Sequence, residues 1–351
     1  MNRSPVTSSR AAMHGFTLVE LMVGLAIGLV LIAGLGLMFA NTSQSGSELN
    51  KSIRQIENGR YAVQLLEDDM AHAGFYGELP LDGINYGPKP SDLQDLCGAT
   101  GHQGWDAATS RAPLPILGLS KDDSANCLSN RLAGTPAFVI HHIGNDAAPI
   151  APASATTGMA YVQTSRCNKD VDPGNPSVAA FAVAATAPAS FPFRSLDCTT
   201  PSPVRPYIAR IYYIASCSEC SGSGADTIPT LKMAELRGNS MTVIPLVEGI
   251  EQMVLEYGVD TAGTGNASSF GIASSTTDWG NIVAVRVHLL SRTTEPSPGF
   301  TDSKTYVLGG STVTIPEADK QFKRRVYTTT VRLTNVAGPR EIPVTTPPAS
   351  S

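Results

Sequence analysis

Apolar and polar residues divide the chain into regions of different periodicity. Residues 21–40 form a run of 20 residues without a charged side chain, long enough for a helix to cross the ~30 Å hydrocarbon core of a bilayer. Behind this run, apolar side chains recur at spacings of three, four and seven residues from Leu49 to Met70, the period of one helix face. We therefore predict one helix over residues 16–73, apolar all round in its first half and amphipathic in its second.

Strand-like patterns occur at residues 137–142 and again from residue 208 onward. Runs rich in β-branched and aromatic residues, separated by short links, predict antiparallel strands, one face of which can receive the amphipathic half of the helix. These runs are residues 137–142, 208–215, 231–236, 241–244, 250–260, 282–290 and 325–333. The predicted fold class is α+β, with a long N-terminal helix packed on an antiparallel β-sheet domain.

Three segments have no clear period. Residues 79–136, rich in Gly, Pro, Asp and Ser, predict an irregular loop, and residues 147–190, rich in Ala, Pro, Ser and Thr, predict a surface excursion. The tail 338–351 contains four prolines and predicts disorder. We expect a β-rich domain over residues 74–337 with long loops, between the helix and this tail.

One carboxylate stands at the edge of the apolar run. Glu20 directly precedes it, and a charge beside the hydrocarbon core is unfavourable, so a partner is expected. Residues 1–15 carry Arg3 and Arg10 and no acidic residue, which keeps the N-terminus in the cytoplasm by the positive-inside rule.

The segment 15–20, Gly-Phe-Thr-Leu-Val-Glu, followed by an apolar helix, resembles a type IV prepilin signal. The resemblance implies that a prepilin peptidase removes residues 1–15, cutting after Gly15, and that the new amine of Phe16 is methylated. It also implies that Glu20 meets the terminal amine of a neighbouring subunit. An ordinary secretory signal would be cut behind its apolar core at an Ala-x-Ala-like site, and none occurs near Ala40. A simple membrane anchor leaves Gly15, Phe16 and Glu20 unexplained.

Two glycines in the apolar run bear on helix packing. Gly24 and Gly28 have the small-xxx-small spacing that lets helices approach closely. The alternative is that they reflect only the general frequency of glycine in membrane helices.

Further segments resemble PilW-type minor pilins. They lie in residues 58–77 and in residues 245–260, 279–286 and 324–329. Spread over residues 16–77 and 205–336, the resemblance covers roughly half the chain. It implies assembly in the inner membrane, with the C-terminal domain in the periplasm, and then a place in the surface pilus at its tip. The implied partners are the major pilin, FimU-, PilV-, PilX- and PilE-like minor pilins and a PilY-family tip protein. The family often has cysteine where this chain has Glu78, which leaves a disulfide at that turn in doubt.

Six cysteines follow the apolar run, an even number that suits the disulfide-forming periplasm. Six cysteines allow fifteen connectivities, and we take pairing between nearest neighbours as the working hypothesis. The pairs are then Cys97 with Cys127, Cys167 with Cys198, and Cys217 with Cys220. A zinc site would need a second Cys-x-x-Cys beside residues 217–220, and none occurs, so a disulfide that fastens this loop is favoured over a metal or redox centre.

The other residues that could bind a metal ion give only weak evidence for such a site. His141 and His142 are adjacent on a strand and should point to opposite faces, which disfavours a metal site. Asp68 and Asp69 are taken as part of a solvated helix face. Residues 260–266 offer oxygen atoms but lack the acidic pattern of an EF-hand, so an ordinary turn is favoured over a calcium site.

The net charge and the sequence motifs disfavour some classes of function. The chain has 25 basic and 30 acidic residues, and loss of residues 1–15 would leave 23 and 30, a net charge of −7. Without a basic stripe, nucleic-acid binding is not supported. No catalytic fingerprint occurs, so we expect no enzyme activity and no cofactor. The predicted function is a minor pilin that primes type IV pilus assembly and supports twitching motility and adhesion. The rivals are a J-like pseudopilin of type II secretion and a membrane-anchored binding protein or hydrolase.

Overall fold

The structure is a computed structural model that describes residues 15–77, 79, 86–90, 93–98, 104–105, 111–144, 159–165, 167–170, 178–183, 191–238 and 240–341. Residues 1–14 of the predicted leader, Glu78 and residues 342–351 of the predicted tail lie outside this set. Contacts divide the chain into two compact units, Met1–Lys51 and Ser52–Ser351, and each is described here by itself.

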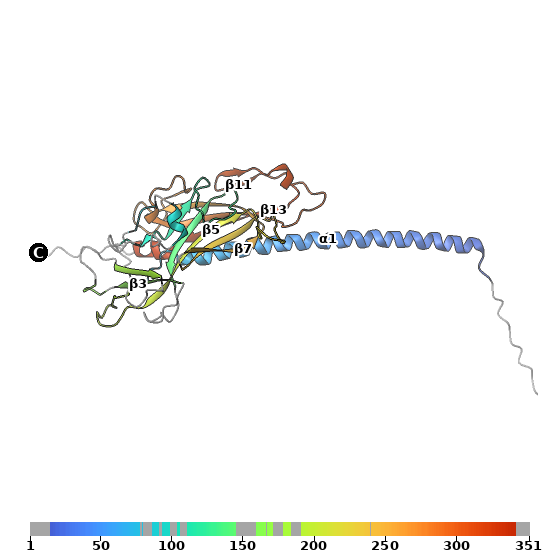
Figure 1. Ribbon diagram of the computed structural model, residues 1–351. Coiled ribbons are helices and arrows are strands. Elements are labelled where there is room, and N and C mark those ends of the chain that lie inside the picture. The colour runs from blue at the N-terminus through green and yellow to red at the C-terminus, as the bar shows by residue number, and fades with distance from the viewer. Residues whose placement is uncertain are drawn as a thin grey trace, which may run out of the picture. The chain divides into compact units, whose positions relative to one another are not determined.

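A single helix, α1 (Leu18–His72), runs from the first unit into the second (Figure 1). It begins at Thr17, whose carbonyl oxygen accepts the first bond of the helix from the backbone N–H of Leu21. It ends before Gly74, which has a φ of +77°. This left-handed conformation is one that glycine adopts without strain and is typical of the residue after a helix C-terminus.

The second unit contains two main β-sheets, and every strand pair within them is antiparallel. The larger sheet has the order β1-β2-β5-β3-β4, with β6 between β5 and β7. Its strands are β1 (Ile116–Leu119), β2 (Ala137–Ile143), β3 (Ala160–Ser165), β4 (Val178–Val183), β5 (Val204–Ala215), β6 (Thr230–Arg237) and β7 (Ser240–Glu248). Pro245 lies in β7, where a residue without an N–H is tolerated because β7 pairs only with β6.

The smaller sheet has the order β13-β10-β8-β9. Its strands are β8 (Ile250–Val259), β9 (Ser269–Gly271), β10 (Ile282–Arg292) and β13 (Arg324–Arg332). A separate hairpin joins β11 (Tyr306–Leu308) to β12 (Ser311–Val313). Short helices complete the unit: η1 (Leu93–Cys97), η5 (Trp279–Asn281), η6 (Glu317–Asp319), α3 (Thr334–Ala337) and η7 (Gly338–Glu341).

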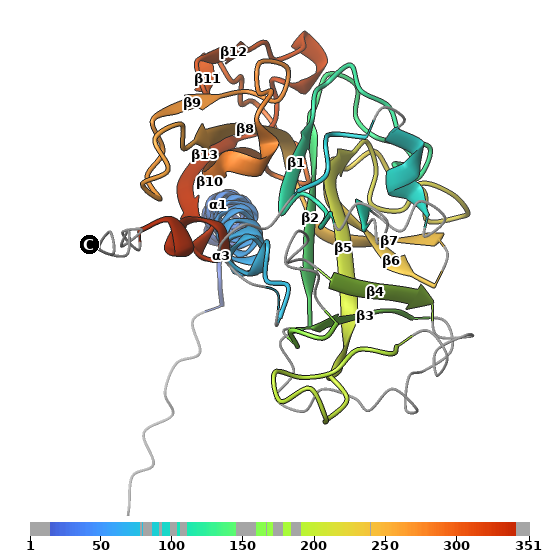
Figure 2. The same cartoon turned by 90° about the vertical axis from the view of Figure 1, so that its left-hand side faces the viewer.

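The second half of α1 lies between the two sheets (Figure 2). Ala62, Leu66 and Met70 are fully buried in one hydrophobic core that also takes side chains from both sheets. Their spacing of four residues puts them on one helix face. The α+β prediction of a long helix packed on antiparallel sheet is confirmed.

The structure corrects two predicted segments. Residues 147–190 contain β3 and β4, and residues 79–136 contain η1 and β1. The missed strands are short or rich in alanine, which has low β-propensity, so their sequences lack a strong signal. The prediction of disorder is also wrong for residues 338–341, which form η7, in which Arg340 donates a hydrogen bond to the Gly280 carbonyl oxygen.

Three disulfides link the six cysteines: Cys97–Cys127, Cys167–Cys198 and Cys217–Cys220. Each joins nearest neighbours along the chain. The first fastens η1 to the loop that follows β1, and the third closes the turn between β5 and β6.

Candidate functional site

The start of α1 is closed by a reciprocal pair of side chains. The Glu20 carboxylate accepts hydrogen bonds from the backbone N–H and the hydroxyl of Thr17, both at 2.9 Å, and the Thr17 hydroxyl oxygen accepts the Glu20 backbone N–H at 3.2 Å. This arrangement is a capping box, which satisfies backbone donors that have no partner within the helix. Both bonds to the carboxylate end on Oε2, so Oε1 is available to a further donor.

The residues before the cap are open to their surroundings. Phe16 is 88% exposed, and a Cβ added at Gly15 would meet no atom within 4 Å. A peptide bond between these two residues is accessible to an enzyme, as the predicted cut requires.

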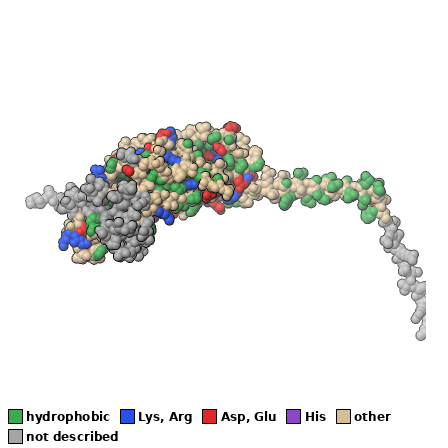
Figure 3. Space-filling model, in the orientation of Figure 1, with side chains coloured by type: hydrophobic (Ala, Val, Ile, Leu, Met, Phe, Trp, Pro, Cys, Tyr) green, Lys and Arg blue, Asp and Glu red, His purple; other side chains and the backbone are tan. Residues whose placement is uncertain are grey.

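The apolar stretch of α1 in the first unit is exposed within the described part of the chain. By length and composition α1 qualifies as a membrane-spanning helix, with a window of mean hydropathy 2.6 that is 0% buried. Hydrophobic side chains cover this stretch in Figure 3. A Cβ added at Gly24 or Gly28 would meet no atom within 4 Å, so the predicted packing role of these glycines concerns other chains and stays a prediction.

The second half of α1 is fastened to both sheets by polar side chains. The amide of Gln55, itself buried, donates to the carbonyl oxygens of Ser291 at 3.0 Å and Lys323 at 2.9 Å. The amide of Asn58 donates to the carbonyl oxygen of Glu248, at the end of β7, at 3.1 Å. Each bond joins the helix to a backbone that cannot shift without disturbing a sheet.

Gly59 is a contact point between α1 and β13. A Cβ at this position would lie 2.2 Å from Cε2 of Tyr327, so the aromatic ring occupies the space that any larger residue needs. Gly59 lies in residues 58–77, one of the segments that resemble PilW-type minor pilins, and the packing of Tyr327 gives a physical reason for glycine at this position.

We expect Gly59→Ala to lower the melting temperature, because overpacking by a methyl group costs about 1–3 kcal/mol and outweighs the gain of about 1 kcal/mol in helix propensity. Gly46→Ala is the matched control on the same helix, with open space around its Cβ, and should leave the melting temperature unchanged or higher. Thermal unfolding followed by circular dichroism measures both. Adding Tyr327→Ala to Gly59→Ala should relieve the clash, so additive losses would contradict the packing argument.

A buried ionic cluster lies where α1 meets the larger sheet, at Asp69. Its side chain is 8% exposed, and Asp69 lies 2.6 Å from Nη1 of Arg210, accepts the hydroxyl of Tyr212 at 2.7 Å and lies 3.4 Å from Nε2 of His142. Arg210 also reaches Glu235 at 2.8 Å. The prediction of a solvated face at residues 68–69 is therefore wrong for Asp69 and holds for Asp68, which is exposed. Adjacent helix side chains diverge, so one faces solvent and the other the sheet.

The electrostatics of the cluster favour the charged form of Asp69. Burial alone would raise the pKa of the carboxyl, but the nearby imidazole of His142, the charge of Arg210 and the hydroxyl of Tyr212 together hold the pKa of Asp69 below its ordinary value. Arg210 and Tyr212 are two residues apart on β5 and therefore share a face, and that spacing was the one sequence signal for this cluster.

The two adjacent histidines serve separate structural contacts. Nδ1 of His141 lies 2.7 Å from the carbonyl oxygen of Leu114, whereas His142 joins the Asp69 cluster on the other face of β2. Burial lowers the pKa of His141 to about 4, so this imidazole is neutral at physiological pH. Among the described residues no group of three or more potential ligands could hold a metal ion.

In the loop after β8, the Asp260 carboxylate accepts hydrogen bonds from backbone groups of the same loop. Asp260 accepts backbone N–H groups from Ala262, Thr264 and Gly265 and lies 3.5 Å from Nη1 of Arg340. A cation bound to this carboxylate would first have to displace these backbone donors. Hydrogen bonds of this kind are typical of an ordinary turn, which is the interpretation that the sequence favours. The loop 217–220 is likewise fastened, because Asp226 accepts the backbone N–H groups of Ser218 and Glu219.

Comparisons with known proteins found two family models that match parts of this chain. Residues 10–36 match the model of the prokaryotic N-terminal methylation motif, and residues 211–335 match the model of type IV pilus-assembly protein W, PilW. Among curated proteins, none matches the chain. A type IV-like pilin, TTHA1219 from Thermus thermophilus, is similar in structure, with 14% identity over 37% of this chain and a TM-score of 0.20. The chain covers 66% of that protein's length, just under two thirds.

Proposed function

We propose that this chain is a type IV pilin-like minor pilin that primes pilus assembly in a complex at the tip. The matches to the prepilin methylation motif and to the PilW model support the proposal, and the observation that carries it is the first unit of the structure. Its capped helix of apolar side chains is exposed within the described residues, and such a surface needs lipid first and the helices of other subunits afterwards.

The chemistry of the start of α1 supports the assembly step. After cleavage behind Gly15, Phe16 would carry the terminal amine and Glu20 would be the fifth residue of the chain. Thr17 occupies only Oε2 of the Glu20 carboxylate, so Oε1 can accept an ammonium group from a neighbouring subunit. That pair would neutralise two charges inside a helical bundle, where isolated charges are unfavourable, and would set the register of the incoming subunit.

The proposed partners come from the resemblance to PilW-type minor pilins. They are the major pilin, the other minor pilins of FimU-, PilV-, PilX- and PilE-like type and a PilY-family tip protein, with the prepilin peptidase acting beforehand. The proposed location is the inner membrane, with the second unit in the periplasm, and later the surface pilus. Twitching motility and adhesion would depend on the assembled filament.

The mature N-terminus gives a direct check on processing. Mass spectrometry of the purified protein should find N-methylated Phe16 as the first residue, and Gly15→Val should leave the leader attached because the cut requires a small residue at that position. An intact Met1 on the wild-type protein would favour the membrane-anchored binding protein or hydrolase instead.

The assembly role is tested by removing the gene and restoring it. Surface pili counted by electron microscopy should fall sharply in the deletion strain and return with the wild-type gene. Exported enzyme activity is measured in the same cultures. Unchanged pili with lost secretion would favour the J-like pseudopilin of type II secretion and would refute the pilus proposal.

A further inference from the structure

The disulfide between Cys217 and Cys220 closes the turn that joins β5 to β6. It links residues 3 positions apart, whereas the other two disulfides link residues 30 and 31 positions apart. A disulfide stabilises a fold mainly by closing a loop of the unfolded chain, and the effect grows with the length of that loop. Stabilisation of the fold is therefore a weaker reason for this bond than for the other two.

The turn is also fastened by hydrogen bonds that do not involve the disulfide. The carboxylate of Asp226 accepts three backbone N–H groups of the turn, each at 2.8 Å, from Ser218, Glu219 and Ile228. The backbone N–H of Asp226 donates to the carbonyl oxygen of Glu219 at 2.9 Å, and β5 and β6 pair with each other on the two sides of the turn. Breaking the S–S bond would therefore leave the turn and the sheet in place.

A buried lysine lies beside this disulfide. Lys232 of β6 is 6% exposed, and its ammonium donates to the carbonyl oxygen of Ser218 at 2.8 Å and lies 3.3 Å from Sγ of Cys220. Lysine is rarely buried unless it is paired with an opposite charge, yet among the described residues these two hydrogen-bond partners are both neutral. The charge of Lys232 also acts on Asp226, but the backbone of the turn holds that carboxylate, and the two side chains form no ion pair in the described structure.

Reduction of the disulfide would supply the charge that Lys232 lacks. A sulfur atom in a disulfide is only a weak hydrogen-bond acceptor, so the oxidised turn does not neutralise the ammonium. A thiolate of Cys220 would stand at the same place, and a cation beside a cysteine stabilises its thiolate. The sulfur atoms of the other two disulfides have backbone N–H groups and one amide oxygen as hydrogen-bond partners within the described residues, so this electrostatic feature belongs to the turn between β5 and β6.

We propose that Cys217–Cys220 is a redox-active disulfide, a site of thiol–disulfide exchange with an external dithiol, at which Lys232 stabilises the thiolate of Cys220. The inference goes beyond the proposed function and does not depend on it, because it concerns only this turn of the second unit. The sequence favoured a purely fastening disulfide, since Lys232 lies 12 positions from Cys220 and no motif connects the two.

The exchange proceeds in two steps. Cys220 is half-buried and Cys217 is buried, so a thiolate of the dithiol attacks Sγ of Cys220, the S–S bond breaks, and the Cys217 sulfur leaves as a thiolate that takes a proton from water. The second thiol of the reductant then loses its proton to solvent and attacks its own sulfur in the mixed disulfide. Cys220 leaves as a thiolate beside Lys232, and two electrons have passed from the dithiol to the two cysteines.

The test is partial reduction of the folded full chain in a nonionic detergent at mildly alkaline pH, with dithiothreitol as the dithiol. Free thiols are trapped with iodoacetamide at successive times and are located by mass spectrometry of peptides. We expect Cys217 and Cys220 to be labelled first, while the other four cysteines stay oxidised and the near-ultraviolet circular dichroism stays that of the folded domain.

Three variants isolate the role of the ammonium. Lys232→Met removes the charge and should slow reduction of this disulfide about threefold, the scale of one partly exposed charge interaction. Lys232→Arg keeps the charge and should reduce at close to the wild-type rate. Lys304→Met is the matched control, because Lys304 is an exposed lysine outside the turn, and it should also reduce like the wild type.

Three results would overturn the inference. The first is labelling of another cysteine pair before Cys217 and Cys220 or together with them, which the wild-type protein alone decides even if a variant does not fold. The second is an unchanged rate in folded Lys232→Met. The third is loss of the near-ultraviolet signal as this disulfide is reduced, because the bond would then be needed to hold the domain together.

Discussion

A strain whose only copy of this protein carries Glu20→Gln should cut and methylate the chain normally yet display few surface pili. Glutamine retains an oxygen that can accept the N–H and hydroxyl of Thr17, so the capping box at the start of α1 persists. What is lost is the charge that we propose meets the terminal amine of a neighbour. Such a pair at 4 Å is worth about 4 kcal/mol at an effective dielectric constant of 20, enough to affect assembly strongly.

Two further variants separate charge from capping. Glu20→Ala removes both, and we expect intact cleavage with the same assembly defect. Glu57→Gln makes the identical change at an exposed position of the same helix and should give wild-type numbers of pili. Mass spectrometry reports processing and electron microscopy counts the filaments. Normal pili in the Glu20→Gln strain would show that capping, and not pairing, is the task of Glu20.

The second large effect is expected at Asp69. Asp69→Asn leaves Arg210 and His142 beside a neutral amide at a buried position, and breaking a buried ion pair costs about 3–5 kcal/mol. Asp68→Asn is the matched control one residue earlier. Asp68 is exposed, so its effect should stay within about 0.5 kcal/mol. Urea unfolding of the full chain in detergent measures the free energy of unfolding for all three proteins.

The difference between the wild type and Asp69→Asn should depend on pH. The folded-state pKa of Asp69 lies below its ordinary value, so the stabilisation is present above the pKa of the unfolded chain, about 3.9. It is lost as the pH falls through the folded-state value. The gap in unfolding free energy should therefore be constant from about pH 5 upward and close in acid. A gap that widens in acid would contradict the assignment of a charged Asp69.

The elements predicted from sequence are those whose signal is local. The strands β5, β8, β10 and β13 are long and rich in β-branched or aromatic residues, and the apolar stripe of α1 continues for several turns. β1 has four residues, β3 has six residues, and three of the six residues of β4 are alanine. Their pairing with distant strands decides their conformation, and no window of the sequence contains that information.

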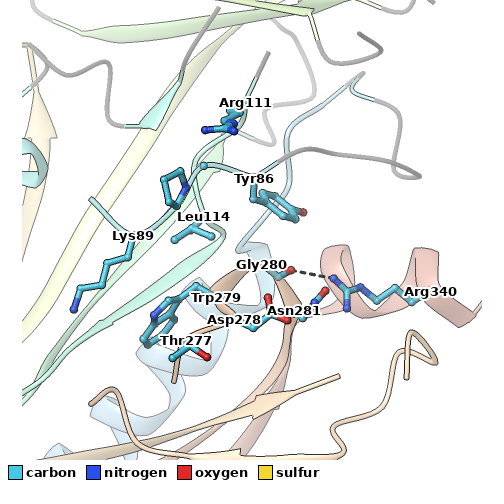
Figure 4. Close-up of a pocket in the computed structure, with 12 residues that line it drawn as sticks. Tyr86, Lys89, Arg111, Leu114, Thr277, Asp278, Trp279, Gly280, Asn281 and Arg340 are labelled. Atoms are coloured by element: carbon cyan, nitrogen blue, oxygen red, sulfur yellow. Dashed lines mark hydrogen bonds between the residues drawn. The ribbon is translucent and has the colours of Figure 1, made fainter. Parts of the chain in front are cut away.

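The same limit explains the candidate sites. Gly15, Phe16 and Glu20 lie within six residues, so their pattern is visible in the sequence. Asp69 and Arg210 are separated by 141 positions, and only the packing of α1 on β5 brings them together. The cavity in Figure 4, which is lined by Lys89, Asp278 and Arg340 among others, is likewise built from segments that no spacing rule connects.

The bonds of Gln55 and Asn58 have a mechanical consequence. A subunit withdrawn from a bilayer would be loaded along the axis of α1, parallel to the interface with both sheets. In that direction the bonds from Gln55 to Ser291 and Lys323 and from Asn58 to Glu248 are sheared together and cannot open one after another. Asp69 with Arg210 adds a further bond in parallel, four turns along the helix. The helix should therefore transmit tension to the whole domain before it slides, and single-molecule pulling on α1 should show one abrupt rupture in place of a series of small steps.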